Sequence, residues 1–201
     1  MEAIRTIEQE AAEDVFFGQV VIIWARWFLI AAGAVLVVWK FNTQATLTVG
    51  IIPILVLMVM NFYLHGRYLM EKPVGTPLII LTSLVDLVII TVLVAFWSVE
   101  PGEPRLRNQF FIFYYPMVLS FAFVMPRRIE IAYTVAALVL YTLVMAFSLG
   151  THETLTGGVA IQNNLKTLLF RLVTLGAMGG LGNYYFRIQR ARRRGALAGG
   201  S

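Results

Sequence analysis

The sequence predicts an all-α, polytopic membrane protein that folds as one bundle of six transmembrane helices. Three observations predict this class. Hydrophobic residues make up 59% of the 201-residue chain, charged residues make up only 13%, and the mean hydropathy is +0.77. An average soluble domain is about 25% charged, so this composition argues against a soluble enzyme. The chain has no cysteine, which excludes a disulfide framework, thiolate metal ligands and cysteine catalysis.

Six apolar segments have the length of membrane-crossing helices. The hydrocarbon core of a bilayer is about 30 Å thick, and a helix crosses it with roughly 20 residues. The segments cover residues 20–39, 47–64, 77–99, 110–125, 131–149 and 167–186. Each is apolar around its whole circumference, which is typical of lipid-facing or fully buried helices. The fourth, with 16 residues, is the shortest, and we expect its helix to begin slightly earlier.

The segments between and beyond the spans are too short to hold another domain, so we expect three parts. Residues 1–18 form a short cytoplasmic helix that runs into the first span, because they carry several acidic side chains and lack the basic start of a signal peptide. Residues 19–187 form the transmembrane domain. Residues 188–201 form a basic cytoplasmic tail and linker.

The basic residues indicate which ends of the spans face the cytoplasm. With the N-terminus inside, the inner segments hold ten lysines and arginines and the outer segments hold four. The ten are Arg5, Arg67, Lys72, Arg127, Arg128, Arg187, Arg190, Arg192, Arg193 and Arg194, and the four are Lys40, Arg105, Arg107 and Lys166. Because short cytoplasmic loops carry an excess of basic residues, both termini are predicted to be cytoplasmic. The same rule explains the arginine-rich tail, so no nucleic-acid partner is expected.

Three ionisable residues fall inside the spans, where an unpaired charge costs about 2.5–3.5 kcal/mol: Arg26, Asp86 and Arg171. Arg26 and Asp86 lie at similar depth, so the simplest arrangement is a buried ion pair between the first and third spans. Such a pair either fixes the packing of the helices or forms a contact that a signal disturbs; alternatively, Arg26 extends to the inner headgroups. Asn61, near the inner end of the second span, is expected to hydrogen-bond a neighbouring helix near Arg26.

Arg171 lies in the outer third of the sixth span, at the depth of the aromatic run that opens the fourth span. Aromatic rings around a cation suit a quinone or a lipid headgroup. The pocket predicted from these residues comprises Arg171, Arg107, Phe111, Tyr114 and Tyr115. The alternative is an arginine that extends outward to the lipid headgroups.

The sequence contains no recognisable catalytic or metal-binding motif. We therefore expect no catalytic residues, no metal ion and no enzyme activity of the chain itself. His65 and His152 are predicted to lie about one bilayer thickness apart, so they are not expected to ligate one haem iron. Gly176 and Gly180, four residues apart in the sixth span, permit close helix packing, either within the chain or in a homodimer.

Several of these residues together resemble a known family. A first span with Arg26-Trp27, a second ending in Asn61 and a third with Asp86 and Thr91 resemble the six-helix sensor region of bacterial membrane histidine kinases. The stretch from Asn108 to Pro116 is similar to the Asn-Pro-Phe…Pro stretch of redox-sensing kinases that respond to quinone, although Gln109 stands where that motif has proline. This resemblance adds Asn108 and Pro116 to the candidate pocket. The layout is similar also to the membrane anchors of class III adenylate cyclases.

The resemblance implies a sensory and dimerising input module of a bacterial inner membrane. Such a module relays a membrane or outer-side signal through the sixth span to a cytoplasmic kinase or cyclase domain, which this chain does not contain. The expected partners are then the lipid bilayer, a second copy of the chain and a cytoplasmic effector domain. The alternative is an accessory or structural subunit of a larger membrane complex that binds lipid, quinone or pigment. A transporter is less favoured, because the spans show neither an inverted repeat nor a polar track.

Overall fold

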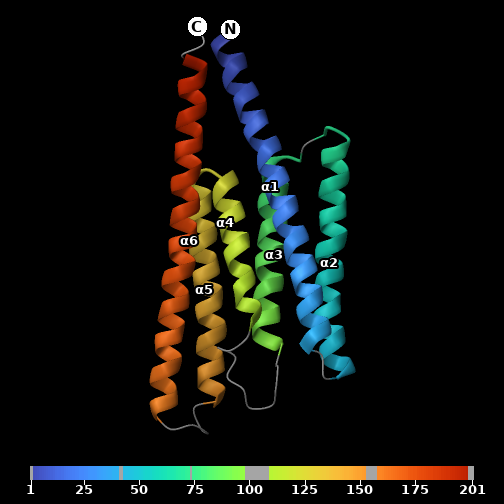
Figure 1. Ribbon diagram of the computed structural model, residues 1–201, viewed down its shortest axis with the longest axis vertical. Coiled ribbons are helices and arrows are strands. Elements are labelled where there is room, and N and C mark those ends of the chain that lie inside the picture. Colours follow the sequence, from blue (N-terminus) through green and yellow to red (C-terminus); the bar gives the residue numbers. More distant parts are fainter. Residues whose placement is uncertain (1, 41–42, 73, 98–108, 153–157, 199–201) are drawn as a thin grey trace.

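The computed structural model describes residues 2–40, 43–72, 74–97, 109–152 and 158–198, which form helices and contain no strand (Figure 1). The all-α prediction is therefore confirmed. The elements are α1 (Glu2–Lys40), α2 (Gln44–Leu69), α3 (Thr76–Phe96), the short 3-10 helix η2 (Gln109–Phe113), α4 (Tyr114–Val124), α5 (Arg127–His152) and α6 (Gly158–Ala198).

Five of the described helices are long and apolar enough to cross a membrane, and they correspond to five of the six predicted spans. The apolar parts are Gly18–Trp39, Thr46–Leu69, Thr76–Phe96, Arg127–Phe147 and Leu165–Gln189. Many large apolar side chains on these helices point out of the bundle, among them Trp24, Phe28, Ile52, Val59, Leu143 and Phe170. A contiguous apolar exterior of this extent suits hydrocarbon rather than water. The chain is therefore a multi-pass membrane protein.

The fourth predicted span is shorter than the others and lies at the centre of the bundle. Its helical part, Gln109–Val124, combines η2 and α4 and is about 26 Å long at the usual rises of the two helix types. Most of its side chains are buried, and α4 packs most extensively against α6 and α1 (Figure 1). A helix that is apolar all round is stable here because protein, rather than lipid, surrounds it.

Two glycines hold the end of α4 between the longest helices. A Cβ atom at Gly18 of α1 would collide with the side chain of Val124. A Cβ atom at Gly182 of α6 would lie 2.5 Å from the Cβ of Ala122. Both helices therefore approach α4 at positions where they carry no side chain, which is the usual device for close packing of membrane helices.

Gln19 fixes the connection between α2 and α3 to α1. Its side chain is buried, and its Nε2 donates to the backbone carbonyl of Leu64 at 3.0 Å. Its Oε1 accepts from the backbone N–H of Val74 at 2.9 Å. A single amide thus pairs the N–H of Val74, which lies outside the helices, and bonds at the same time to a carbonyl of α2.

The two ends of the bundle differ in the number of basic residues that they carry. The start of α1 and the end of α6 lie at the same end, and both helices extend there beyond the others (Figure 1). The start of α5 and the connection from α2 to α3 lie toward this end too. It carries the basic residues Arg67, Lys72, Arg127, Arg128, Arg187 and Arg192, whereas Lys40 and Lys166 lie near the other end. This asymmetry is the one expected for a membrane protein whose two termini share a side.

We expect Gly182→Leu to destabilise the bundle because the new side chain must push α6 away from Ala122. Overpacking of this kind costs about 1–3 kcal/mol, equivalent to a lowering of the thermal midpoint by roughly 5 °C for a chain of this size. The matched control is Gly180→Leu, because a Cβ there meets no described atom within 4 Å. Thermal unfolding in detergent measures both. Equal losses of stability in the two variants would contradict the packing described.

Candidate functional site

Arg26 of α1 and Asp86 of α3 form an ion pair at the centre of the bundle, in the arrangement expected from their depth. Both side chains are 0% exposed. Nε of Arg26 donates to Oδ2 of Asp86 at 2.6 Å, and Nη2 lies 2.6 Å from the same oxygen. Nη1 of Arg26 and Oδ1 of Asp86 have no hydrogen-bond partner among the described residues. Each charge is therefore compensated by the other, since neither side chain is exposed at the surface of the bundle.

Polar groups from neighbouring helices surround this pair. Nδ2 of Asn61, on α2, donates to the backbone carbonyl of Ile23 in α1 at 3.2 Å, which is the kind of interhelical contact expected for this residue. The hydroxyl of Tyr133, on α5, donates to the carbonyl of Ser83 at 3.0 Å, one turn before Asp86. Four helices therefore meet around one buried charged contact.

A second candidate site is a groove of about 1000 Å³ that opens on the outside of the bundle between α1 and α6. Its floor is η2 and the start of α4, and it lies toward the end opposite the termini. The lining residues are Phe28, Ala31, Ala32, Val35, Leu36, Gln109, Phe111, Ile112, Phe113, Tyr115, Pro116, Thr167, Phe170 and Arg171. The groove is therefore mainly apolar and aromatic, with one cation and a few neutral polar groups.

Arg171 is held in this groove by aromatic residues. Its Nη1 donates to the hydroxyl of Tyr141 at 3.0 Å, and its guanidinium carbon lies 4.6 Å from the centre of the Phe111 ring. No carboxylate of the described residues pairs with it. The hydroxyl of Tyr115 lies 2.7 Å from that of Thr174, which ties α4 to α6 beside the groove. The arginine is thus positioned, yet its charge is not neutralised by the described part of the chain.

The groove contains four of the residues predicted for the ligand pocket: Arg171, Phe111, Tyr115 and Pro116. The prediction for Tyr114 was wrong, because this side chain is 0% exposed and its hydroxyl lies 2.7 Å from that of Thr91 on α3. Successive helical residues face different directions, so Tyr114 points into the bundle while Tyr115 faces the groove. The predicted Arg107 and Asn108 lie outside the described residues.

The contribution of α1 to the groove is absent from the sequence prediction. Phe28, Ala31, Ala32, Val35 and Leu36 form one wall. Large and small side chains occur together along this face, but this pattern indicates a groove wall only when the neighbouring helix is known. The sequence does not show that α1 and α6, the first and last spans, lie on either side of the same segment.

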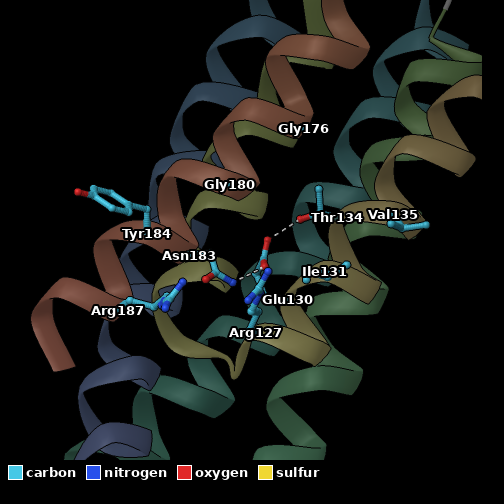
Figure 2. Close-up of a pocket in the computed structure, with 10 residues that line it drawn as sticks. All are labelled: Arg127, Glu130, Ile131, Thr134, Val135, Gly176, Gly180, Asn183, Tyr184 and Arg187. Carbon is cyan, nitrogen blue, oxygen red and sulfur yellow. Dashed lines mark hydrogen bonds between the residues drawn. The ribbon is translucent and has the colours of Figure 1, made fainter. Parts of the chain in front are cut away.

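The predicted packing role of Gly176 and Gly180 is not met within the described chain. A Cβ at either position would meet no described atom within 4 Å, whereas one at Gly179 would lie 2.6 Å from the Oγ1 of Thr134. The close approach of α6 to α5 and α4 is therefore made at Gly179 and Gly182. Gly176 and Gly180 instead line a cleft between α5 and α6 on the outside of the bundle (Figure 2). A contact of these glycines in a homodimer stays a prediction.

Glu130 is a buried carboxylate that the sequence analysis missed. It lies in the first turn of α5, just before the predicted fifth span, and its side chain is only 3% exposed. Oε1 accepts from the Thr134 hydroxyl at 3.0 Å, and Oε2 accepts from Nδ2 of Asn183, on α6, at 2.8 Å (Figure 2). The carboxylate thus joins α5 to α6. The sequence could have indicated this residue, because an acidic side chain in the first turn of a helix interacts favourably with the helix dipole.

Comparison with known proteins gives no match: no family model, no curated protein and no solved structure matches the chain. The resemblance to kinase sensor regions therefore stays a prediction. Among the described residues, no group of three histidine, cysteine or acidic side chains gathers in a way that could hold a metal ion. What the described geometry offers is binding, through the groove at Arg171 and the cleft beside Glu130.

Asp86→Leu is expected to destabilise the protein strongly, because Arg26 then lies buried without its counter-charge. Removing one partner of a buried pair costs about 3–5 kcal/mol. The double substitution Arg26→Met with Asp86→Leu should recover most of this loss, since no unpaired charge remains. The free energy of unfolding, measured by titration with a denaturing detergent, tests both.

Val88→Leu serves as control, because Val88 is exposed on the outside of the same helix. It should behave like the unmodified protein. A coupling energy between positions 26 and 86 below about 0.5 kcal/mol in the double-mutant cycle would contradict a direct interaction between the two charges.

Proposed function

We propose that the chain is a membrane input module that binds the polar ring of a membrane-soluble quinone in the groove at Arg171. Binding is converted into a displacement of α6, which passes the signal to a cytoplasmic effector domain. The observation that carries this proposal is the groove itself, whose two walls belong to α1 and α6. These are the two helices that extend beyond the others, at the end of the bundle where both termini lie (Figure 1).

The chemistry of the groove suits a flat ring with hydrogen-bond acceptors. Several aromatic side chains line it, including Phe111, Phe113 and Phe170, and such rings favour stacked or edge-on contact with another ring. Arg171 supplies the strongest donor, and Gln109 and Thr167 lie at the same site. Carbonyl oxygens of a quinone would accept from Arg171 and Gln109. The groove opens to the outside of the bundle, so an isoprenoid tail can stay in the lipid.

The architecture supports coupling from the groove to the far end of α6. This helix runs without interruption from Gly158 to Ala198, so a tilt at Arg171 is carried to its arginine-rich end. Because α4 lies between α1 and α6, a ring inserted against η2 and α4 acts on both walls. Movements of packed helices in such switches are about 1–2 Å. Binding that favours one of two packings is sufficient to shift their populations.

In this proposal the ion pair of Arg26 and Asp86 defines the resting state. It joins α1 to α3, so α1 is anchored while α6 is attached mainly to α4 and α5. α6 is then the element that moves. The module would act in a bacterial inner membrane, with both termini cytoplasmic and a second copy of the chain as partner. The basic end of the bundle, at the termini, supports this orientation.

The alternative is an accessory subunit of a larger membrane complex that holds a lipid, quinone or pigment in the same groove. The two functions differ in one respect. An input module must change the position of α6 when the groove is filled, whereas an accessory subunit needs only to retain the molecule.

We expect decylubiquinone to bind the full chain in lipid nanodiscs and to change the distance between the ends of α1 and α6. The chain lacks cysteine, so spin labels can be placed at Glu8→Cys and Arg192→Cys without background. The mean distance should shift by about 1–2 Å or more. Arg171→Gln should weaken binding about tenfold, because a hydrogen bond to a charged donor is lost.

Two further variants make the result specific. Lys166→Gln removes the same charge one turn and a half away and does not line the groove, so it should bind like the unmodified chain. Ala31→Trp fills the groove from an exposed position of α1 and should abolish binding while Arg171 is intact. Absence of binding to the unmodified chain contradicts the quinone site. Binding without a distance change contradicts the input module and favours the accessory subunit.

A further inference from the structure

The cleft between α5 and α6 lies on the outside of the bundle, toward the end that holds both termini. Its volume is about 360 Å³. Figure 2 shows Arg127, Glu130 and Asn183 at one end of it together with Arg187, while Gly180 and Gly176 lie further along α6. The cleft is separate from the groove at Arg171, and the two share no lining residue.

The polar end of the cleft is suited to an anion. Arg127 is the first residue of α5 and Arg187 comes from α6, and both side chains are exposed. The structure gives neither of them an ion pair with a described carboxylate. The N-terminus of the 26-residue helix α5 adds a partial positive charge at the same place.

Glu130 is the acidic group that faces this cleft, and its oxygens are already used. One accepts from Thr134 and the other from Asn183. Its side chain is almost fully buried, whereas the two arginines are exposed. The described charged groups of the cleft therefore sum to one positive charge, from two arginines and one carboxylate.

The remainder of the cleft is apolar and faces the lipid. Gly176 and Gly180 leave a furrow along α6, because no side chain fills it and no described atom would meet a Cβ there. Ile131 and Val135, exposed on α5, form the opposite wall. In a bilayer this surface lies at the depth of the upper acyl chain, directly next to the charged end. A small free anion would make no favourable contact with such an apolar furrow.

We infer that this cleft binds an anionic phospholipid, with its phosphate between Arg127 and Arg187 and one acyl chain in the furrow at Gly176 and Gly180. Basic pockets between membrane helices at the cytoplasmic surface recognise anionic headgroups in this way. Glu130 and Asn183 hold α5 and α6 at the separation that the headgroup requires. Occupation of the cleft thus joins α6 to α5 through the lipid as well as through the protein.

Native mass spectrometry of the full chain tests the inference, with the detergent-solubilised protein offered phosphatidylglycerol and phosphatidylcholine together. The chain should retain phosphatidylglycerol preferentially. Arg127→Gln with Arg187→Gln should reduce this preference about thirty-fold, the factor that corresponds to about 2 kcal/mol for two basic residues near the membrane surface. Arg128→Gln with Arg192→Gln is the matched control, because both arginines are exposed at the same end but do not line the cleft. It should retain the preference.

Gly180→Leu tests the furrow without changing any charge, and its Cβ meets no described atom within 4 Å. It should lower retention of phosphatidylglycerol while the thermal stability of the chain is unchanged. Three results would overturn the inference. They are an equal loss in the control pair, displacement of the lipid by inorganic phosphate that binds on its own, and a Gly180→Leu variant that retains lipid normally. In the last case, a change from dimer to monomer would identify the furrow as a contact between two copies.

Discussion

The packing of this bundle depends on one constraint, which is that hydrocarbon offers no partner to a buried charge. Arg26 and Asp86 lie at the same depth in α1 and α3, and neither can be solvated where it is. Each helix can therefore adopt only the rotation and depth that bring the two together. The contacts of Asn61 with α1 and of Tyr133 with α3 follow from the same requirement, since polar groups that accompany the pair must also find partners within the protein.

With α1 fixed to α3, the position of α4 explains the rest of the arrangement. This short helix is buried on most sides and separates the first helix from the last. The glycines at positions 18 and 182 let both long helices approach it closely at one end. At the other end the large aromatic side chains of η2 and of the start of α4 keep the walls apart. The groove at Arg171 is the consequence of this difference in side-chain size along one central helix.

α6 takes part in both candidate binding sites, which lie toward opposite ends of the bundle. Arg171 lies in the groove beside α1, and Arg187 lies in the cleft beside α5. Between these two positions the inward face of the helix carries Gly179 and Gly182 together with the fully buried Leu175. The two glycines let the helix approach α5 and α4 closely. A ligand at one site would therefore alter the position of a helix that also forms the other site.

The sequence by itself determined the all-α membrane class, five of the long apolar helices and the depth of Arg26, Asp86 and Arg171, because hydropathy and helical rise depend only on local residues. It also indicated that Arg26 needs a counter-charge, since the energetic cost of burial does not depend on the fold. Only the tertiary structure decided the rotation of each helix about its axis. Tyr114 faces inward rather than the groove, Gly179 rather than Gly180 faces the bundle, and Glu130 is buried by α6. For helices that are apolar on every side, the local pattern does not distinguish the inward face from the lipid-facing one, so long-range contacts make that choice.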